Sequence, residues 1–279
     1  MYHTIISAHE LKAHLNDANW RIIDCHHDLK DVDLGRKLYQ SAHIPGAIYA
    51  HLDNDLSGFV VPGETGRHPL PTTAGIAALL GRWGIDNDTQ VIVYDDKKGA
   101  IAARVWWMFR YLGHEKVAVL DGGFSHWKKE ELPTDANVPT YDCRTFVTQV
   151  QTAWVKDTDA VADWAQKSDY TVVDSRTAER YRGEHEPIDP VAGHIPGAIN
   201  MPFPENWNEN GLLKSPEQLR ERFAYLDKPQ QTVFYCGSGV TACHNLLAYK
   251  YAGLGDACLY PGSWSGWIAD GKRLVAKKV

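Results

Sequence analysis

The chain has 279 residues, of which 44% are hydrophobic and 23% charged, and its formal net charge is −6 at pH 7. This composition is typical of a globular protein long enough for two domains. It argues against nucleic acid as the main partner, because phosphate binding needs clustered lysine and arginine and the sequence has no long run of either charge.

The cysteine pattern and the N-terminal residues indicate where the protein works. The five cysteines are odd in number and lack Cys-x-x-Cys spacing, which is typical of reduced thiols. Residues 1–6 lack the basic and apolar parts of a signal peptide, and no apolar run approaches the roughly 18 residues of a membrane span. We therefore predict a cytoplasmic protein with no membrane partner. We also expect no bound metal, because no Cys/His ligands are paired at zinc-finger spacing.

Short β-branched runs alternate with helical patterns along the first half of the chain. Strands are predicted over 21–24, 91–94 and 117–120, and helices over 73–83 and 102–112. Capping-box patterns at Ser7-Ala8-His9-Glu10 and Ser215-Pro216-Glu217-Gln218 predict two further helix starts. This alternation predicts an α/β fold with a parallel sheet flanked by helices on both faces.

The same landmarks occur twice in the same order. His43-Ile44-Pro45-Gly46-Ala47-Ile48 recurs letter for letter at 194–199, 22–24 matches 172–174, and 122–127 matches 262–267. Two copies of one domain explain this pattern. We predict an N-terminal domain over 1–135, a linker over 136–151 and a C-terminal catalytic domain over 152–279. The linker region is also compatible with an extended arm across the surface.

The repeated His-Ile-Pro-Gly-Ala segment invites a catalytic interpretation. Proline and glycine at these places are typical of a rigid turn, in which the histidine makes local hydrogen bonds. Because both copies keep the segment and only one keeps the cysteine loop described next, we predict a structural role.

Cys236 stands between a predicted strand over 232–235 and a helical pattern. The positive end of a helix and convergent backbone N–H groups favour the thiolate, which is the nucleophile. Gly237 and Gly239 permit an anion-binding nest, to which Ser238 and Thr241 add hydroxyl donors. The alternative is an inert, buried cysteine at a tight turn. We expect the other four cysteines to be inert and buried in this way.

Two comparisons narrow the chemistry of this loop. The first copy has Asp95 where the second has Cys236, so we predict a single active site without a catalytic cysteine in the N-terminal domain. Cysteine-dependent phosphatases use a similar loop of the form Cys-x5-Arg, whose arginine clamps the phosphoryl group. Here the sixth residue after Cys236 is Ala242 and the loop has no arginine, which disfavours phosphatase chemistry.

The loop 236–242, the duplicated turn and the segments 103–108 and 262–267 resemble the tandem-domain rhodanese family of sulfurtransferases. The similarity runs from about Ser7 to Trp267. It implies two rhodanese-like domains in tandem, no cofactor, and capture of a donor's sulfur as a Cys236 persulfide. The implied partners are a small-molecule sulfur donor and acceptor, with a thioredoxin-like protein as a further acceptor. We expect a monomer or weak dimer.

Within this family the chain is most similar to the branch that uses 3-mercaptopyruvate. Gly237 and Ser238 stand where thiosulfate sulfurtransferases typically carry arginine and lysine. Without a cation in the loop, doubly charged sulfite is harder to stabilise as a leaving group. The resemblance therefore implies transfer from 3-mercaptopyruvate to a thiol, cyanide or a dithiol protein, with release of pyruvate. A thiosulfate sulfurtransferase and a low-turnover persulfide carrier are the alternatives.

The resemblance also implies roles for individual residues. Arg180 is expected to hold the donor carboxylate, and Ser238, His68 and Asp53 to handle the proton. Donor-binding positions in the loop are Gly237, Gly239, Val240 and Thr241.

One position departs from the family. Its second arginine usually follows a Glu-Pro pair, but Ile188 stands there in this chain. Arg182, Arg67 and His185 are the replacements that we consider.

Overall fold

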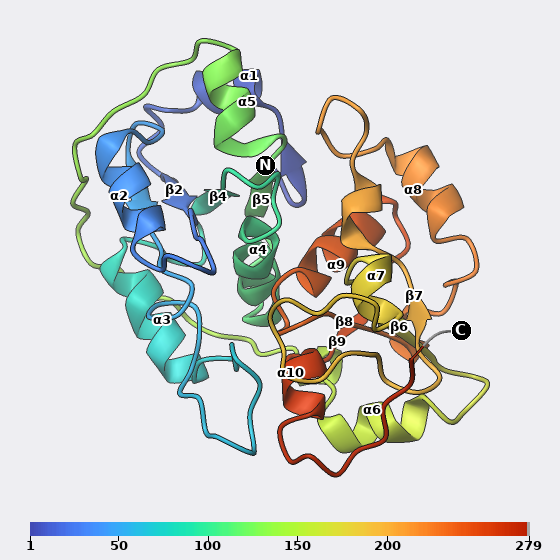
Figure 1. Ribbon diagram of the computed structural model, residues 1–279. Helices are drawn as coiled ribbons and strands as arrows, with labels where there is room; N and C mark the ends of the chain where they lie inside the picture. The colour runs from blue at the N-terminus through green and yellow to red at the C-terminus, as the bar shows by residue number, and fades with distance from the viewer. Residues whose placement is uncertain (278–279) are drawn as a thin grey trace. The chain divides into compact units, whose positions relative to one another are not determined.

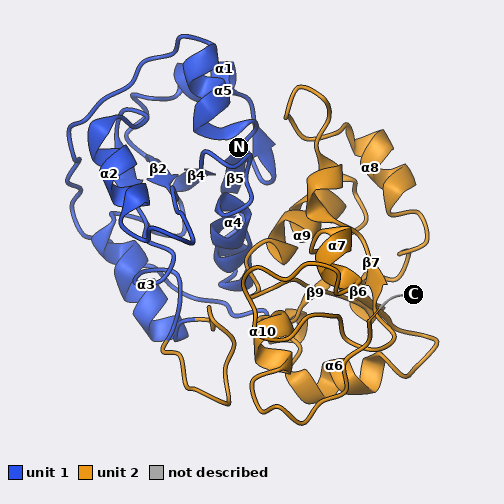
Figure 2. Cartoon of the chain, in the orientation of Figure 1, with its two compact units in different colours: residues 1–58, 71–151 blue, residues 59–70, 152–279 orange. Residues whose placement is uncertain are grey.

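The computed structural model describes residues 1–277 and separates into two compact units, coloured blue and orange in Figure 2. Unit 1 contains Met1–Gly58 and Pro71–Gln151, and unit 2 contains Phe59–Leu70 and the chain from Thr152 onward. Each unit is an α/β structure built on one parallel sheet (Figure 1). The predicted fold class is confirmed.

Unit 1 is built on a five-stranded sheet with the strand order β1-β5-β4-β2-β3. All its strand pairs are parallel, and helical crossovers connect them. The strands are β1 (Ile5–Ile6), β2 (Trp20–Asp24), β3 (Ala47–Tyr49), β4 (Gln90–Tyr94) and β5 (Val117–Leu120). The helices are α1 (Ala8–Ala13), α2 (Leu34–Ser41), α3 (Thr73–Arg82), α4 (Ala102–Tyr111) and α5 (Gly123–Lys129).

Different helices cover the two faces of this sheet. Helices α1, α2 and α5 supply Leu11, Tyr39 and Trp127 to a buried cluster with Ile22 and Ile92. Helix α4 packs against β4 and β5 and lies outside that cluster. A sheet buried on both faces explains why its central strands read as continuous apolar runs.

Unit 2 repeats this plan with a four-stranded parallel sheet in the order β7-β6-β8-β9. Its strands are β6 (Thr171–Asp174), β7 (Ile199–Asn200), β8 (Thr232–Tyr235) and β9 (Cys258–Leu259). Its helices are α6 (Thr158–Trp164), α7 (Ala178–Tyr181), α8 (Pro216–Arg222), α9 (Ala242–Tyr251) and α10 (Ser263–Trp267). Short 3₁₀ helices cover Thr152–Trp154 (η1), Phe203–Asn206 (η2) and Pro229–Gln231 (η3).

The predicted elements agree closely with the observed ones. Helix α3 ends one residue before the predicted end at position 83, and both predicted capping boxes are present, at Ser7 and Ser215. Within residues 1–277, no helix combines the length and apolar character that a membrane-spanning segment needs.

The observed units differ from the predicted domain boundaries in two ways. Residues 59–70, predicted within the domain 1–135, group with unit 2, and residues 136–151, predicted as a linker, group with unit 1. Backbone hydrogen bonds from Arg144 to Gly81 (2.9 Å) and from Gln149 to Leu112 (2.8 Å) hold the second segment. It is therefore an extended arm along unit 1, the alternative that the sequence left open.

The duplicated turns make matching contacts in the two units. Nδ1 of His43 lies 2.7 Å from the carbonyl oxygen of Tyr39, and Nδ1 of His194 lies 2.7 Å from that of Tyr181. In each pair the imidazole stacks on the tyrosine ring. Both histidines are buried. These contacts support the predicted structural role.

Asp95 follows β4 and is fully buried. Its carboxylate accepts four backbone hydrogen bonds of 2.7–2.9 Å, from the N–H groups of Lys97, Gly99, Ile101 and Ala102. The nest at this strand–helix junction is thus filled by a side chain of the protein itself.

Replacing this carboxylate tests its importance for unit 1. Asp95→Ala leaves the four N–H groups without their acceptor, and buried unpaired donors are costly. We expect the free energy of unfolding to fall by about 3–5 kcal/mol, measured by urea denaturation. Exposed Glu115 supplies the control: Glu115→Ala should change stability by less than about 0.5 kcal/mol. Equal stability of both variants would contradict this assignment.

Candidate active site

Cys236 directly follows β8, and the loop 236–241 leads into the first residue of α9. Its side chain is buried. Burial alone would raise the pKa of the thiol, but hydrogen bonds from the Thr241 hydroxyl and from the N–H groups of Ser238, Ala242 and Gly239 outweigh it and hold that pKa below its usual value. The arrangement therefore favours a buried, nucleophilic thiolate.

The backbone of the loop explains its two glycines. Gly239 has φ of +77°, and a Cβ there would lie 2.5 Å from the carbonyl oxygen of Pro261. Any other residue would be strained and would clash with backbone. A Cβ at Gly237 would instead lie 3.0–3.5 Å from guanidinium nitrogens of Arg67 and Arg180.

The turn before α10 fixes the position of Cys236. The backbone N–H of Cys236 donates to Oγ of Ser263 at 3.1 Å, and this hydroxyl donates to the carbonyl oxygen of Tyr260. The N–H of Trp264 in turn donates to the carbonyl oxygen of Cys236 at 2.9 Å. Ser263 was not among the predicted site residues, because it is 27 positions away and nothing in the sequence pairs it with Cys236.

Ser238 and His68 lie together in unit 2. Nδ1 of His68 is 2.7 Å from Oγ of Ser238, and both side chains are buried. The preceding residue, Arg67, is anchored by a hydrogen bond of 3.1 Å from its N–H to Oγ of Ser265. The proline-bracketed segment thus brings an imidazole to the serine two positions after the nucleophile, where a proton can be exchanged.

Arg180 and Arg67 both approach Gly237, and one carboxylate joins them. Nη2 of Arg180 donates to Oδ2 of Asp189 at 3.1 Å, and Nη1 of Arg67 donates to Oδ1 of the same side chain. Asp189 was not among the predicted site residues, although it directly follows Ile188, which stands in place of the expected second arginine.

Further ion pairs extend this arrangement into the interior. Glu186 accepts hydrogen bonds from Arg180 (2.7 Å) and from Arg176 (3.2 Å), and Arg176 pairs with Asp174 at the end of β6. The side chains of Glu186 and Arg176 are 3% and 1% exposed, respectively. Six alternating charges therefore connect the end of β6 to Arg67.

The side chains of the other predicted residues take no part in this network, although the backbone N–H of Ile188 donates to Oε1 of Glu186 at 3.2 Å. The side chain of Ile188 is exposed, Arg182 pairs with Glu184 at the surface, and His185 is exposed. Val240 is buried, and its carbonyl oxygen accepts the N–H of Cys243.

Two predictions concern residues outside the loop. Asp53 belongs to unit 1, where its carboxylate lies 3.9 Å from Nδ1 of His51, so its proposed catalytic role stays a prediction. Cys143 was expected to be buried, but it lies exposed on the extended arm, because a segment that runs along a surface leaves alternate side chains in solvent.

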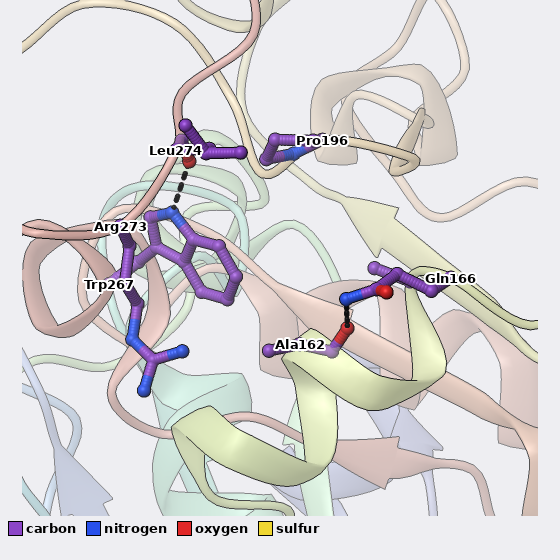
Figure 3. Close-up of a pocket in the computed structure, with 7 residues that line it drawn as sticks. Ala162, Gln166, Pro196, Trp267, Arg273 and Leu274 are labelled. Atoms are coloured by element: carbon purple, nitrogen blue, oxygen red, sulfur yellow. Dashed lines mark hydrogen bonds between the residues drawn. The ribbon is translucent and has the colours of Figure 1, made fainter.

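Unit 2 also contains a pocket of about 360 Å³ that includes none of the predicted site residues. Figure 3 shows its lining residues, among them Gln166 on the chain after α6 and Trp267 at the end of α10. The indole N–H of Trp267 donates to the carbonyl oxygen of Leu274 at 3.0 Å. Without a nucleophile or a buried charge, this pocket offers no chemistry comparable to that of the cysteine loop.

Comparison with known proteins agrees with this geometry. The model of the rhodanese-like domain matches residues 7–130 and 157–270. The chain belongs to the rhodanese family. It is 43% identical to the "probable 3-mercaptopyruvate sulfurtransferase" of Pseudomonas aeruginosa, over 98% of this chain and 97% of that protein. It is 40% identical to the thiosulfate sulfurtransferase of Cricetulus griseus, over 84% of this chain and 80% of that protein.

A solved structure shows the same fold over nearly the whole chain. The crystal structure of a 3-mercaptopyruvate sulfotransferase from Escherichia coli superposes with a TM-score of 0.82 at 30% identity. The match covers 95% of this chain and all of the other. The predicted family membership and the two rhodanese-like domains are thus confirmed.

The hydroxyl of Thr241 offers a direct test of thiolate stabilisation. Thr241→Val removes a hydrogen bond that lowers the pKa of Cys236, so the pKa should rise. We expect the midpoint of the pH dependence of iodoacetamide alkylation to move to higher pH. The measurement uses a Cys143→Ser background, because Cys143 is exposed and would also be alkylated. An unchanged midpoint would show that Thr241 does not stabilise the thiolate.

Proposed function

We propose that this protein is a sulfurtransferase that moves sulfane sulfur from 3-mercaptopyruvate, through a persulfide on Cys236, to a thiol, cyanide or a dithiol protein. The observation that carries this proposal is the buried Cys236 thiol with a lowered pKa, in a loop without a charged residue. The sulfurtransferase names of relatives that match nearly the whole chain support the reaction class.

The proposed transfer begins with attack of the Cys236 thiolate on the donor sulfur. A sulfur–sulfur bond forms, the carbon–sulfur bond of the donor breaks, and the electron pair stays on carbon as the enolate of pyruvate. A proton then converts the enolate to pyruvate, and we assign its delivery to Ser238 and His68, a role that their hydrogen bond supports. An acceptor thiolate or cyanide removes the outer sulfur and restores the Cys236 thiolate.

The N–H groups directed at Cys236 serve both forms of the site. They stabilise the thiolate before attack, and we propose that they also stabilise a persulfide anion after it. Glycine at position 237 keeps the space beside the nucleophile free of a side chain. We further propose a cytoplasmic, monomeric or weakly dimeric enzyme, with a thioredoxin-like protein among its acceptors.

Thiosulfate is the second candidate donor. The two guanidinium groups beside Gly237 supply positive charge to an anionic leaving group, although none comes from the loop itself. The identity shared with a thiosulfate sulfurtransferase points the same way. A paired measurement of kcat/KM decides between the donors: we expect the higher value with 3-mercaptopyruvate, and a clearly higher value with thiosulfate would reverse the assignment.

The persulfide itself is tested by intact-mass analysis after incubation with each donor. We expect the wild-type protein to gain one sulfur and Cys236→Ser to gain none. Full activity of Cys236→Ser would refute the mechanism. Persulfide formation without repeated turnover would instead indicate a carrier.

His68 provides a test of proton delivery. His68→Gln can keep a hydrogen bond to Ser238 but has no group that titrates near neutral pH. We expect kcat with 3-mercaptopyruvate to fall by about 100-fold. Turnover of thiosulfate needs no proton on its leaving group and should fall much less. Equal losses with both donors would indicate a structural role for His68.

A further inference from the structure

Two arginines from distant parts of the sequence reach the same place beside the nucleophile. A Cβ built on Gly237 would lie 3.0 Å from Nη2 of Arg67 and 3.4 and 3.5 Å from Nη2 and Nη1 of Arg180. We propose that Arg67 and Arg180 together bind the carboxylate and carbonyl oxygens of the donor, an assignment that rests on the proposed function. Arg67 thereby takes the role for which Ile188 has no suitable side chain.

The two guanidinium groups keep donors available for such a ligand. Nη1 of Arg180 and Nη2 of Arg67 donate to no described residue, whereas the Nε of Arg180 is occupied by Glu186. The side chains of Arg67 and Arg180 are 31% and 15% exposed, so a small molecule can reach them. Paired N–H groups of this kind match the oxygens of an α-keto acid.

Asp189 holds the two arginines side by side. Its carboxylate is 2% exposed and gives one oxygen to each guanidinium. Because both of its oxygens are already engaged, it orients the pair in advance of donor binding. Asp189 is therefore a positioning residue.

The charge of Arg67 acts on the nucleophile as well as on the donor. Burial lowers the pKa of Arg67, and the largest opposing effect is the electrostatic attraction between its guanidinium and Cys236, which raises that pKa. The thiolate and the guanidinium thus stabilise each other. A donor held by Arg67 is accordingly held next to Cys236.

Steady-state kinetics with two donors test the proposal. Arg67→Met is compared with Arg180→Met, using 3-mercaptopyruvate and inorganic polysulfide, which has no carboxylate. We expect either variant to lose about 10- to 100-fold in kcat/KM with 3-mercaptopyruvate, mainly through KM. Persulfide formation from polysulfide, followed by intact mass, should fall clearly less, because that reaction loses only the effect of the arginine charge and no carboxylate contact. The inhibition constant of pyruvate should rise in parallel with KM.

Matched controls distinguish donor binding from other causes. Arg182→Met removes an arginine that pairs with Glu184 at the surface and should leave both reactions unchanged. Arg67→Lys keeps the charge but not the planar fork, and should recover only part of the loss.

The outcomes separate this proposal from the proposed function. An unchanged KM in Arg67→Met, or an equal loss with both donors, overturns the role of Arg67 and leaves the sulfurtransferase intact. A wild-type protein that forms the persulfide from polysulfide but does not turn over 3-mercaptopyruvate overturns the donor assignment itself.

Discussion

A buried negative charge at the turn between a strand and a helix is tolerated only when hydrogen-bond donors are directed at it. Both units meet this condition at the same point of the fold, after β4 and after β8. In unit 1 the charge belongs to Asp95, which binds the N–H groups permanently. In unit 2 the same kind of nest faces a thiol. Both copies of the domain thus have a nest of backbone N–H groups at this junction. The nest stabilises the fold in unit 1 and favours a reactive thiolate in unit 2.

The ion pairs of unit 2 form a second constraint on the site. Charges of alternating sign run from the end of β6 toward Arg67. The residues are Asp174, Arg176, Glu186, Arg180 and Asp189. Removing one member of a buried pair leaves an uncompensated charge, which is strongly destabilising. The chain of pairs therefore fixes the side chains of Arg180 and Arg67 more firmly than a surface pair would.

Most of the fold could be predicted because its signals are local. Capping boxes at Ser7 and Ser215 and apolar runs such as 232–235 depend on neighbouring residues. Cys236 could be singled out for the same reason, since its glycine-rich loop is contiguous.

The rest depends on contacts between distant residues. The pairing of His68 with Ser238 spans 170 positions, and that of Arg67 with Asp189 spans 122. Proline and histidine at 68–71 predict a rigid loop but not which unit it joins, and Asp189 looks like an ordinary surface acid beside proline. Only the folded structure shows that His68 pairs with Ser238 and Arg67 with Asp189.

The membership of residues 59–70 in unit 2 has a consequence for how this enzyme is made. A fragment that begins at Thr152 would contain Cys236 but neither Arg67 nor His68. During synthesis, the segment 59–70 leaves the ribosome long before β8 and must wait for its partner to be translated. The duplication therefore did not yield two contiguous modules. Residues 59–70 come from the N-terminal half of the sequence but belong to unit 2, so no single cut in the chain divides it into the two units.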